Sequence, residues 1–189
     1  MMEFRAQARG TAADGARDAV ESLLRRPAES GWNEDELELE LEMLHGRLAV
    51  LDLEAILQAG SLPVVATQHK AVAHETCHFL APVSVAGEAG ASSAKLFVTS
   101  RRIRVLGARD VSVTWGTIRD VRVDARDLIV SSAGAVQHLL RCNSFADAWV
   151  AARLARALVE RHRASSAGEP GPAPGAGHDP PLPSAHPQG

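Results

Sequence analysis

The stretch from Cys77 to Cys142 constrains the fold more than any other part of the chain, because short apolar stretches alternate there with turn-forming residues. Seven such stretches follow one another at regular spacing, which is typical of an all-β sandwich or barrel. We predict strands at residues 77–85, 95–100, 102–106, 111–115, 118–123, 128–131 and 136–142. No helical pattern separates them, so the sheet should be antiparallel.

One amphipathic helix is predicted after the last strand. Ser144 fits its N-cap position and Asp147 its third helical position. Apolar side chains from Phe145 to Val159 recur at helical spacing, with arginines on the other side. The predicted fold class is therefore α+β: a small seven-stranded antiparallel barrel or sandwich closed by a C-terminal amphipathic helix.

Two stretches of the strand region resemble PH/GRAM-like domains, including bacterial PH-like proteins. The sequence KLFVTSRRIR at residues 95–104 resembles the place where a short strand runs into T-x-x-R and the next strand. The sequence VTWGTIRDV at residues 113–121 resembles the segment that follows. The resemblance covers about residues 62–163. It implies a PH-like fold that binds or docks, although a fold alone does not assign a ligand.

In some members of that superfamily, basic residues between the first two strands bind phosphoinositide headgroups. The corresponding stretch here, residues 86–94, contains Glu88 and no lysine or arginine, which disfavours that site. Basic residues come later in the chain, where arginine forks would suit phosphate or carboxylate groups. The candidates for binding an anion or a partner are Lys95, Arg101, Arg102 and Arg104. Alternatively, these charges only protect an exposed strand edge.

Residues 74–78 match the H-E-x-x-H pattern of zinc hydrolases. On a helix, His74 and His78 would share one face as zinc ligands, with Glu75 as the general base. In a strand, two residues four positions apart are separated by about 13 Å. That is too far for one ion whose bonds to nitrogen are about 2 Å long.

The backbone conformation decides between these two interpretations. Alternation that begins at Cys77 places Cys77 and Phe79 on one face of a strand and His78 on the other. Pro82 limits any helix soon afterwards. We therefore expect a strand with no cofactor and no catalysis, and a zinc-dependent hydrolase is the alternative.

A long helix is predicted before the strand region. Asn33 and Glu36 fit a capping box, and Trp32 with Leu37 fits a hydrophobic staple. Leucines then recur at spacings of four and three, and Gly46 is a point where the helix could break. This leucine stripe comprises Leu37, Leu41, Leu44, Leu48 and Leu51. It can pack on its own domain or pair with a second copy of the chain, which makes a homodimeric scaffold a further alternative.

Composition divides the chain into a flexible N-terminal segment with a short helix, an acidic helical arm, a PH/GRAM-like domain and a disordered Pro/Gly-rich tail. These parts span residues 1–31, 32–60, 61–163 and 164–189. Residues 1–60 carry 6 basic and 13 acidic side chains, whereas residues 61–163 carry 14 basic and 8 acidic ones. This asymmetry favours self-contact, a dimer or an anionic partner.

The chain contains no apolar run long enough to span a membrane and no apolar signal-peptide core, so we expect a cytoplasmic protein. Cys77 and Cys142 are too few for a disulfide framework and are expected as buried thiols. Aromatic residues make up only 4% of the chain, which disfavours base stacking on nucleic acid. The predicted function is a non-catalytic docking module for a protein partner, with contact to an anionic membrane as a second option.

Overall fold

The computed structural model describes residues 15, 17–22, 34–87, 90–107 and 110–167. Residues 17–22 are helical, as predicted for this segment. The proposed capping box, the staple tryptophan and most of the predicted tail lie outside the described residues. Neither of the two long helices in the described part is long and apolar enough to cross a membrane.

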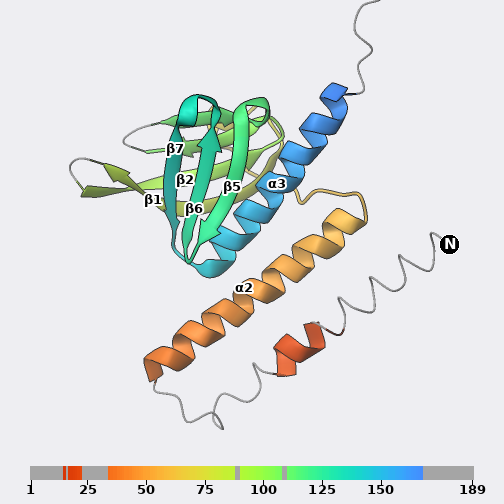
Figure 1. Cartoon of the computed structure of the whole chain (residues 1–189), viewed down its shortest axis with the longest axis vertical. Coiled ribbons are helices and arrows are strands. Elements are labelled where there is room, and N and C mark those ends of the chain that lie inside the picture. Colours follow the sequence, from red (N-terminus) through yellow and green to blue (C-terminus); the bar gives the residue numbers. More distant parts are fainter. Residues whose placement is uncertain (1–14, 16, 23–33, 88–89, 108–109, 168–189) are drawn as a thin grey trace, which may run out of the picture.

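Two long helices and seven strands make up the described part (Figure 1). The helices are α2 (Glu34–Gln58) and α3 (Phe145–Ala167). The strands are β1 (Cys77–Gly87), β2 (Gly90–Thr99), β3 (Arg102–Leu106), β4 (Val111–Thr114), β5 (Ile118–Asp124), β6 (Asp127–Ser132) and β7 (Gln137–Cys142). Three short 3-10 helices connect them: η2 (Lys70–Val72), η3 (Trp115–Thr117) and η4 (Ala133–Ala135).

The strands form one antiparallel sheet in the order β4-β3-β2-β1-β7-β6-β5, which confirms the predicted α+β, PH-like class. The sheet is an open sandwich, so the barrel form of the prediction is wrong: β4 and β5 do not pair. Side chains of α3 bind the free edge of β5 instead. Arg156 Nε donates to the carbonyl oxygen of Val121 at 2.9 Å, and Arg163 Nη2 donates to that of Ile118 at 3.3 Å.

The main core lies between the inner face of the folded sheet and α3. Aliphatic side chains of four strands and α3 are at most 1% exposed there. They include Leu96, Val98, Ile103, Val105, Leu128, Val130, Leu140 and Leu154. Burying a side chain of this size stabilises a fold by about 1.5–3 kcal/mol. Leu53 of α2 belongs to the same core and is 4% exposed, so α2 packs as part of the fold.

Helix α2 runs alongside α3 in the same direction (Figure 1). Gly46 does not break it, contrary to the alternative considered from the sequence. A Cβ atom on Gly46 would lie 3.0 Å from Cε3 of Trp149 and 3.2 Å from the backbone nitrogen of Ala146. Glycine is therefore the residue that lets the two helices approach closely.

The start of α3 matches the prediction, since the backbone N–H of Asp147 donates to Ser144 Oγ at 3.0 Å. Helix α2 supplies a second cap that the sequence pattern did not reveal. Glu42 Oε1 accepts the backbone N–H of Phe145 at 3.0 Å, and its other oxygen pairs with Arg126. At its C-terminus, α3 continues to Ala167, past the predicted boundary at residue 163.

The hairpin of β1 and β2 is longer than predicted. Ala86 pairs with Ala91 and Gly87 with Gly90, so most of the expected loop at residues 86–94 is strand. Gly90 has φ +105°, a backbone conformation that glycine adopts readily and other residues do not.

The start of β1 corrects a second expectation. A β-bulge between Cys77 and Phe79 shifts the register, so the two residues do not share a face. Phe79 packs on the main core, whereas Cys77 joins Val72 and Phe97 in a smaller cluster. Residues 61–76, which we call the covering segment, extend over this cluster, and Val65 N–H donates to the carbonyl oxygen of Cys77 at 2.8 Å.

Candidate functional site

Two of the predicted anion-binding residues line a polar cleft, which we call the arginine cleft. Its walls come from the β2–β3 turn, the end of β4 with η3, and the last turns of α3. The lining residues are Ser100, Arg101, Arg102, Thr114, Trp115 and His162. The cleft holds about 600 Å³, which lies within the range of small-molecule sites.

Thr99 fixes the shape of the β2–β3 turn. Its side chain is fully buried, and its hydroxyl oxygen accepts the backbone N–H groups of Arg101 at 3.2 Å and Arg102 at 3.1 Å. Bonds of this kind hold a tight turn in one conformation. The turn therefore presents Arg101 to solvent and leaves Arg102 half-buried.

Trp115, one of the residues that line the cleft, contains an unsatisfied donor. Its side chain is 3% exposed, and its buried Nε1 has no hydrogen-bond partner in the described part of the chain. The indole N–H can only donate, and an unpaired buried donor costs about 1–3 kcal/mol. Purely apolar surroundings do not explain the missing hydrogen-bond partner, because Trp115 also borders a polar cleft.

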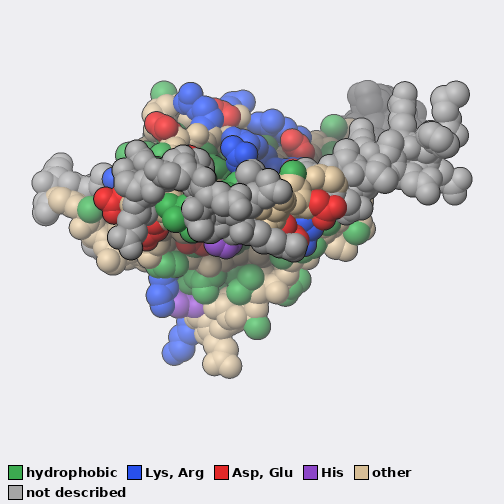
Figure 2. Space-filling model, turned by 90° about the horizontal axis from the view of Figure 1, so that it is seen from below, with side chains coloured by type: hydrophobic (Ala, Val, Ile, Leu, Met, Phe, Trp, Pro, Cys, Tyr) green, Lys and Arg blue, Asp and Glu red, His purple; other side chains and the backbone are tan. Residues whose placement is uncertain are grey.

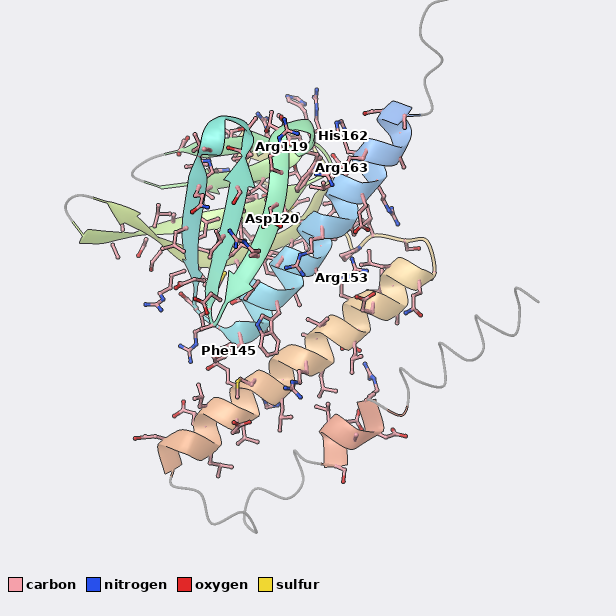
Figure 3. All side chains as sticks on the ribbon, viewed as in Figure 1. Arg119, Asp120, Phe145, Arg153, His162 and Arg163 are labelled. Carbon is pink, nitrogen blue, oxygen red and sulfur yellow. The ribbon has the colours of Figure 1, made fainter. Side chains whose placement is uncertain are left out.

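Gly116 allows η3 to lie close to the end of α3. A Cβ atom at this position would sit 3.0 Å from Nε2 of His162. Figure 3 shows His162 and Arg163 on the last turns of α3, with Arg119 at the same end of the molecule. Arg163 Nη2 also reaches the backbone oxygen of Arg119 at 3.4 Å.

Positive charge is concentrated around the arginine cleft. Arg101 and Arg119 are exposed, and the side chains of both lack a hydrogen bond or ion pair to any described residue. Nearby Asp120 is paired with Arg122 at 2.9 Å. Figure 2 views the molecule from below, at the end away from Arg119 and His162, and shows basic side chains there in separate groups.

Arg102 is held by the covering segment. Its Nη2 forms an ion pair with Glu75, whose side chain is 3% exposed, and Thr99 Oγ1 donates to the other carboxylate oxygen. Burial works to raise the pKa of Glu75, but the hydrogen bonds from Thr99 and Arg102 outweigh it and lower the pKa below its usual value. Arg102 Nε remains buried and unpaired within the described residues.

The other two predicted basic residues lie outside the cleft. Arg104 Nη1 donates to the carbonyl oxygen of Ala71 at 2.7 Å and so holds the covering segment. Lys95 is exposed on β2, opposite Leu106 of β3. The structure therefore brings together only Arg101 and Arg102 of the four candidates.

The H-E-x-x-H stretch is not helical, so the arrangement that the zinc alternative requires is absent. His74 and Glu75 lie in a turn, and His78 belongs to β1. His78 is 6% exposed, with Nδ1 2.7 Å from the carbonyl oxygen of Pro63, whereas His74 is exposed. No group of three His, Cys, Asp or Glu residues that could hold a metal ion occurs in the described ranges.

The leucine stripe lies on the side of α2 away from Gly46 and Leu53, which face α3 and the core. Leu44 is buried and the other four leucines are half-buried. The helical residues 17–22 lie near its C-terminal end, where Arg17 forms an ion pair with Asp52. Dimerisation through this stripe stays a prediction.

Trp115 and His162 were not among the predicted site residues. Trp115 is buried, and its unpaired N–H depends on the surrounding contacts and leaves no pattern in the sequence. The sequence feature that comes nearest to indicating the cleft is Gly116, because a glycine at such a position often marks a close approach of the backbone to another element.

No protein-family model matches this chain, and no curated protein matches its sequence. Among solved structures, the C-terminal domain of an unknown protein from Leishmania infantum is 13% identical with a TM-score of 0.41, covering 47% of this chain and 89% of that one. The FERM and C-terminal domain complex of Drosophila Merlin is 13% identical with a TM-score of 0.40, covering 75% of this chain and 47% of that one. The DH/PH fragment of PDZRHOGEF, in a complex with human RhoA, is 11% identical with a TM-score of 0.40, covering 82% of this chain and 54% of that one. This chain thus spans about half the length of the Merlin and PDZRHOGEF chains.

Proposed function

We propose that this chain is a non-catalytic docking module whose arginine cleft binds an anionic group, a phosphate or a carboxylate, carried by a protein partner. The observation that carries the proposal is the buried indole N–H of Trp115, which lacks a hydrogen-bond partner within the described residues. Trp115 is one of the residues that line the arginine cleft, which also contains Arg101, whose guanidinium forms no ion pair with a described residue.

The chemistry of the lining favours an anion. Every lining side chain has an N–H or O–H group or a ring nitrogen, two are arginines, and none is a carboxylate. An anion would accept hydrogen bonds from these groups and interact with the Arg101 charge. A cation or an apolar group would leave the Trp115 donor unsatisfied and would also desolvate an arginine.

The hydroxyl groups in the cleft support binding rather than catalysis. Ser100 Oγ accepts the backbone N–H of Thr76 at 3.2 Å, and Thr114 Oγ1 lies 3.4 Å from Thr117 Oγ1. Neither hydroxyl is hydrogen-bonded to His162, and an activated nucleophile needs an adjacent general base.

A protein partner is favoured over a lipid surface. Anionic membranes attract clusters of several lysine or arginine residues on an exposed surface. The hairpin stretch at residues 86–94 contains none, and Arg102 and Arg104 are occupied by the covering segment. Cys77 and Cys142 are free thiols, and this supports the proposal that the protein works in a reducing compartment such as the cytoplasm.

The test follows the indole N–H signal of Trp115 in a ¹⁵N–¹H correlation spectrum, assigned by its loss in Trp115→Phe. A phosphoserine peptide, its unphosphorylated twin and inorganic phosphate are titrated separately. We expect the phosphopeptide and, more weakly, phosphate to move this signal downfield, because the donor gains an acceptor. Arg101→Gln should weaken phosphopeptide binding about tenfold, in line with the loss of one charge-assisted hydrogen bond.

Lys95→Gln is the matched control, since it removes an equal charge from an exposed position outside the cleft. It should leave binding unchanged. Equal effects of the two substitutions, or an unmoved Trp115 signal at saturating phosphopeptide, would refute the proposed site. Sedimentation with vesicles containing phosphatidylserine separates the membrane alternative: binding that requires Arg101 and exceeds peptide binding would replace the protein partner with a membrane.

A further inference from the structure

A second cavity lies between α2, α3, β5 and the helical residues 17–22, which contribute Val20 to its wall, away from the arginine cleft. It holds about 460 Å³. Its apolar walls include Val50 and Leu51 of α2, Trp149 and Ala152 of α3, and Val123 of β5. The cavity is partly open to solvent, and its volume lies within the range of small-molecule sites.

The packing of the two helices explains why the space persists. At Gly46 the helices meet closely, since a side chain there would overlap Trp149. Further along, Glu54 holds Arg153 through two hydrogen bonds, one of them at 3.0 Å, which fixes the helix spacing on the other side of the cavity. Figure 3 shows Arg153 on the side of α3 that faces α2. The walls are thus braced at two points and cannot simply collapse.

Three arginines border this apolar space: Arg47, Arg153 and Arg156. Arg153 is neutralised by Glu54. Arg156 uses only Nε, on the carbonyl oxygen of Val121, and Arg47 has no hydrogen bond or ion pair to any described residue. The cavity therefore combines apolar walls with two guanidinium groups that have N–H donors without a partner among the described residues.

We infer that this cavity binds a small amphipathic anion, namely a medium-chain aliphatic carboxylate with its tail against Trp149 and its carboxylate at Arg47 and Arg156. The apolar walls provide the driving force for the tail. Arginine suits the carboxylate because its N–H groups can bind both oxygens. A neutral ligand would not use the free guanidinium groups, and a cation would be repelled by them.

Trp149 provides the measurement. Full-length protein is titrated with hexanoate, octanoate, decanoate and their terminally brominated forms, and bromine quenching of tryptophan fluorescence is recorded. We expect affinity to rise about fourfold per added methylene until the cavity is full. In a Trp32→Phe background, Trp149→Phe should remove most of the quenching, because Trp115, the remaining tryptophan, lies in the other cleft.

Two substitutions test the two halves of the inference. Val50→Phe fills the cavity and should weaken decanoate at least tenfold, while Leu48→Phe, on the same helix but outside the cavity wall, should not. Arg47→Gln should weaken decanoate but leave decanol unchanged, and Arg122→Gln, an exposed arginine outside the cavity, is its control. Circular dichroism confirms that each variant is folded.

The inference fails if affinity does not depend on chain length, or if decanol binds as tightly as decanoate. It also fails if Arg47→Gln and Arg122→Gln act alike, which would indicate general attraction to a basic surface. Retained quenching in Trp149→Phe would place the carboxylate elsewhere. Because Arg47 is accessible and remote from the core, its result decides the matter even if Val50→Phe does not fold.

Discussion

Replacing Glu75 with glutamine should destabilise the fold and should do so only above acidic pH. Glu75 accepts hydrogen bonds from Arg102 Nη2 and Thr99 Oγ1 while its side chain is 3% exposed. Glutamine keeps the shape and one acceptor but loses the charge. Removing one partner of a buried ion pair costs about 3–5 kcal/mol. Arg102 is 32% exposed and can be hydrated again, so we expect about 2 kcal/mol.

The pH dependence checks the cause. The pKa of Glu75 is lower in the folded chain than in the unfolded one, so its contribution is complete above pH of about 4.3 and is lost as the pH falls through the folded value. Urea unfolding of wild type and Glu75→Gln should therefore differ at pH 7 and converge only once the pH falls below the folded pKa of Glu75. His74→Gln, an exposed neighbour, should change stability by less than about 0.5 kcal/mol. A Glu75→Gln penalty no larger than that of His74→Gln, or one that persists in acid, would refute the buried ion pair.

Three further measurements test other parts of the structure. Gly46→Val should cost about 1–3 kcal/mol in urea unfolding because its Cβ would overlap Trp149, whereas Ala55→Val at an exposed position of α2 should be nearly neutral; equal effects would contradict the close helix approach. Burial, with smaller contributions from Asp147 and Asp127, raises the pKa of Cys142 to about 12 from 9.0. Folded protein should therefore react slowly with iodoacetamide at pH 8, and it should lose stability as the pH rises from about 9 towards 12. Rapid labelling of Cys142 before unfolding would contradict this. If the leucine stripe joins two copies, Leu41→Gln should shift the mass measured by sedimentation equilibrium from dimer to monomer. A wild-type protein that is already monomeric, with the same mass as the variant, would remove the homodimer alternative.

The strand pattern was predictable because it depends on local alternation and turn residues. Six of seven strands lie within about two residues of their predicted starts, and the exception is β2, which begins at Gly90 instead of residue 95. The alanine and serine residues there have no strong strand preference, and only pairing with β1 makes them a strand.

The side-chain partners were not predictable in the same way. Nothing local shows that Glu75 reaches Arg102, or that Arg104 binds the backbone at Ala71. The bulge between Cys77 and Phe79 likewise follows from pairing with β2, so simple alternation gave Cys77 the wrong face. Only part of the arginine cleft could be predicted from the sequence. Two adjacent arginines after a strand indicated an anion site, whereas Trp115 joins that site only through the tertiary fold.

The two proposed sites share α3, which raises the question of whether they are coupled. His162 borders the arginine cleft and Trp149 borders the apolar cavity, and 13 residues of helix place them about 20 Å apart. Coupling requires an element with two arrangements that each ligand distinguishes. Between these residues α3 is one continuous helix whose buried face packs on the core, which favours independent sites.

We therefore expect saturating decanoate to change phosphopeptide affinity by less than about twofold, and the reverse titration to agree, because coupling is reciprocal. Isothermal titration calorimetry with each ligand present in turn provides the measurement. A reciprocal change above about fivefold would show that α2 or the covering segment moves with binding. The Glu75–Arg102 pair would then be the contact to examine, since it links the covering segment to the arginine cleft.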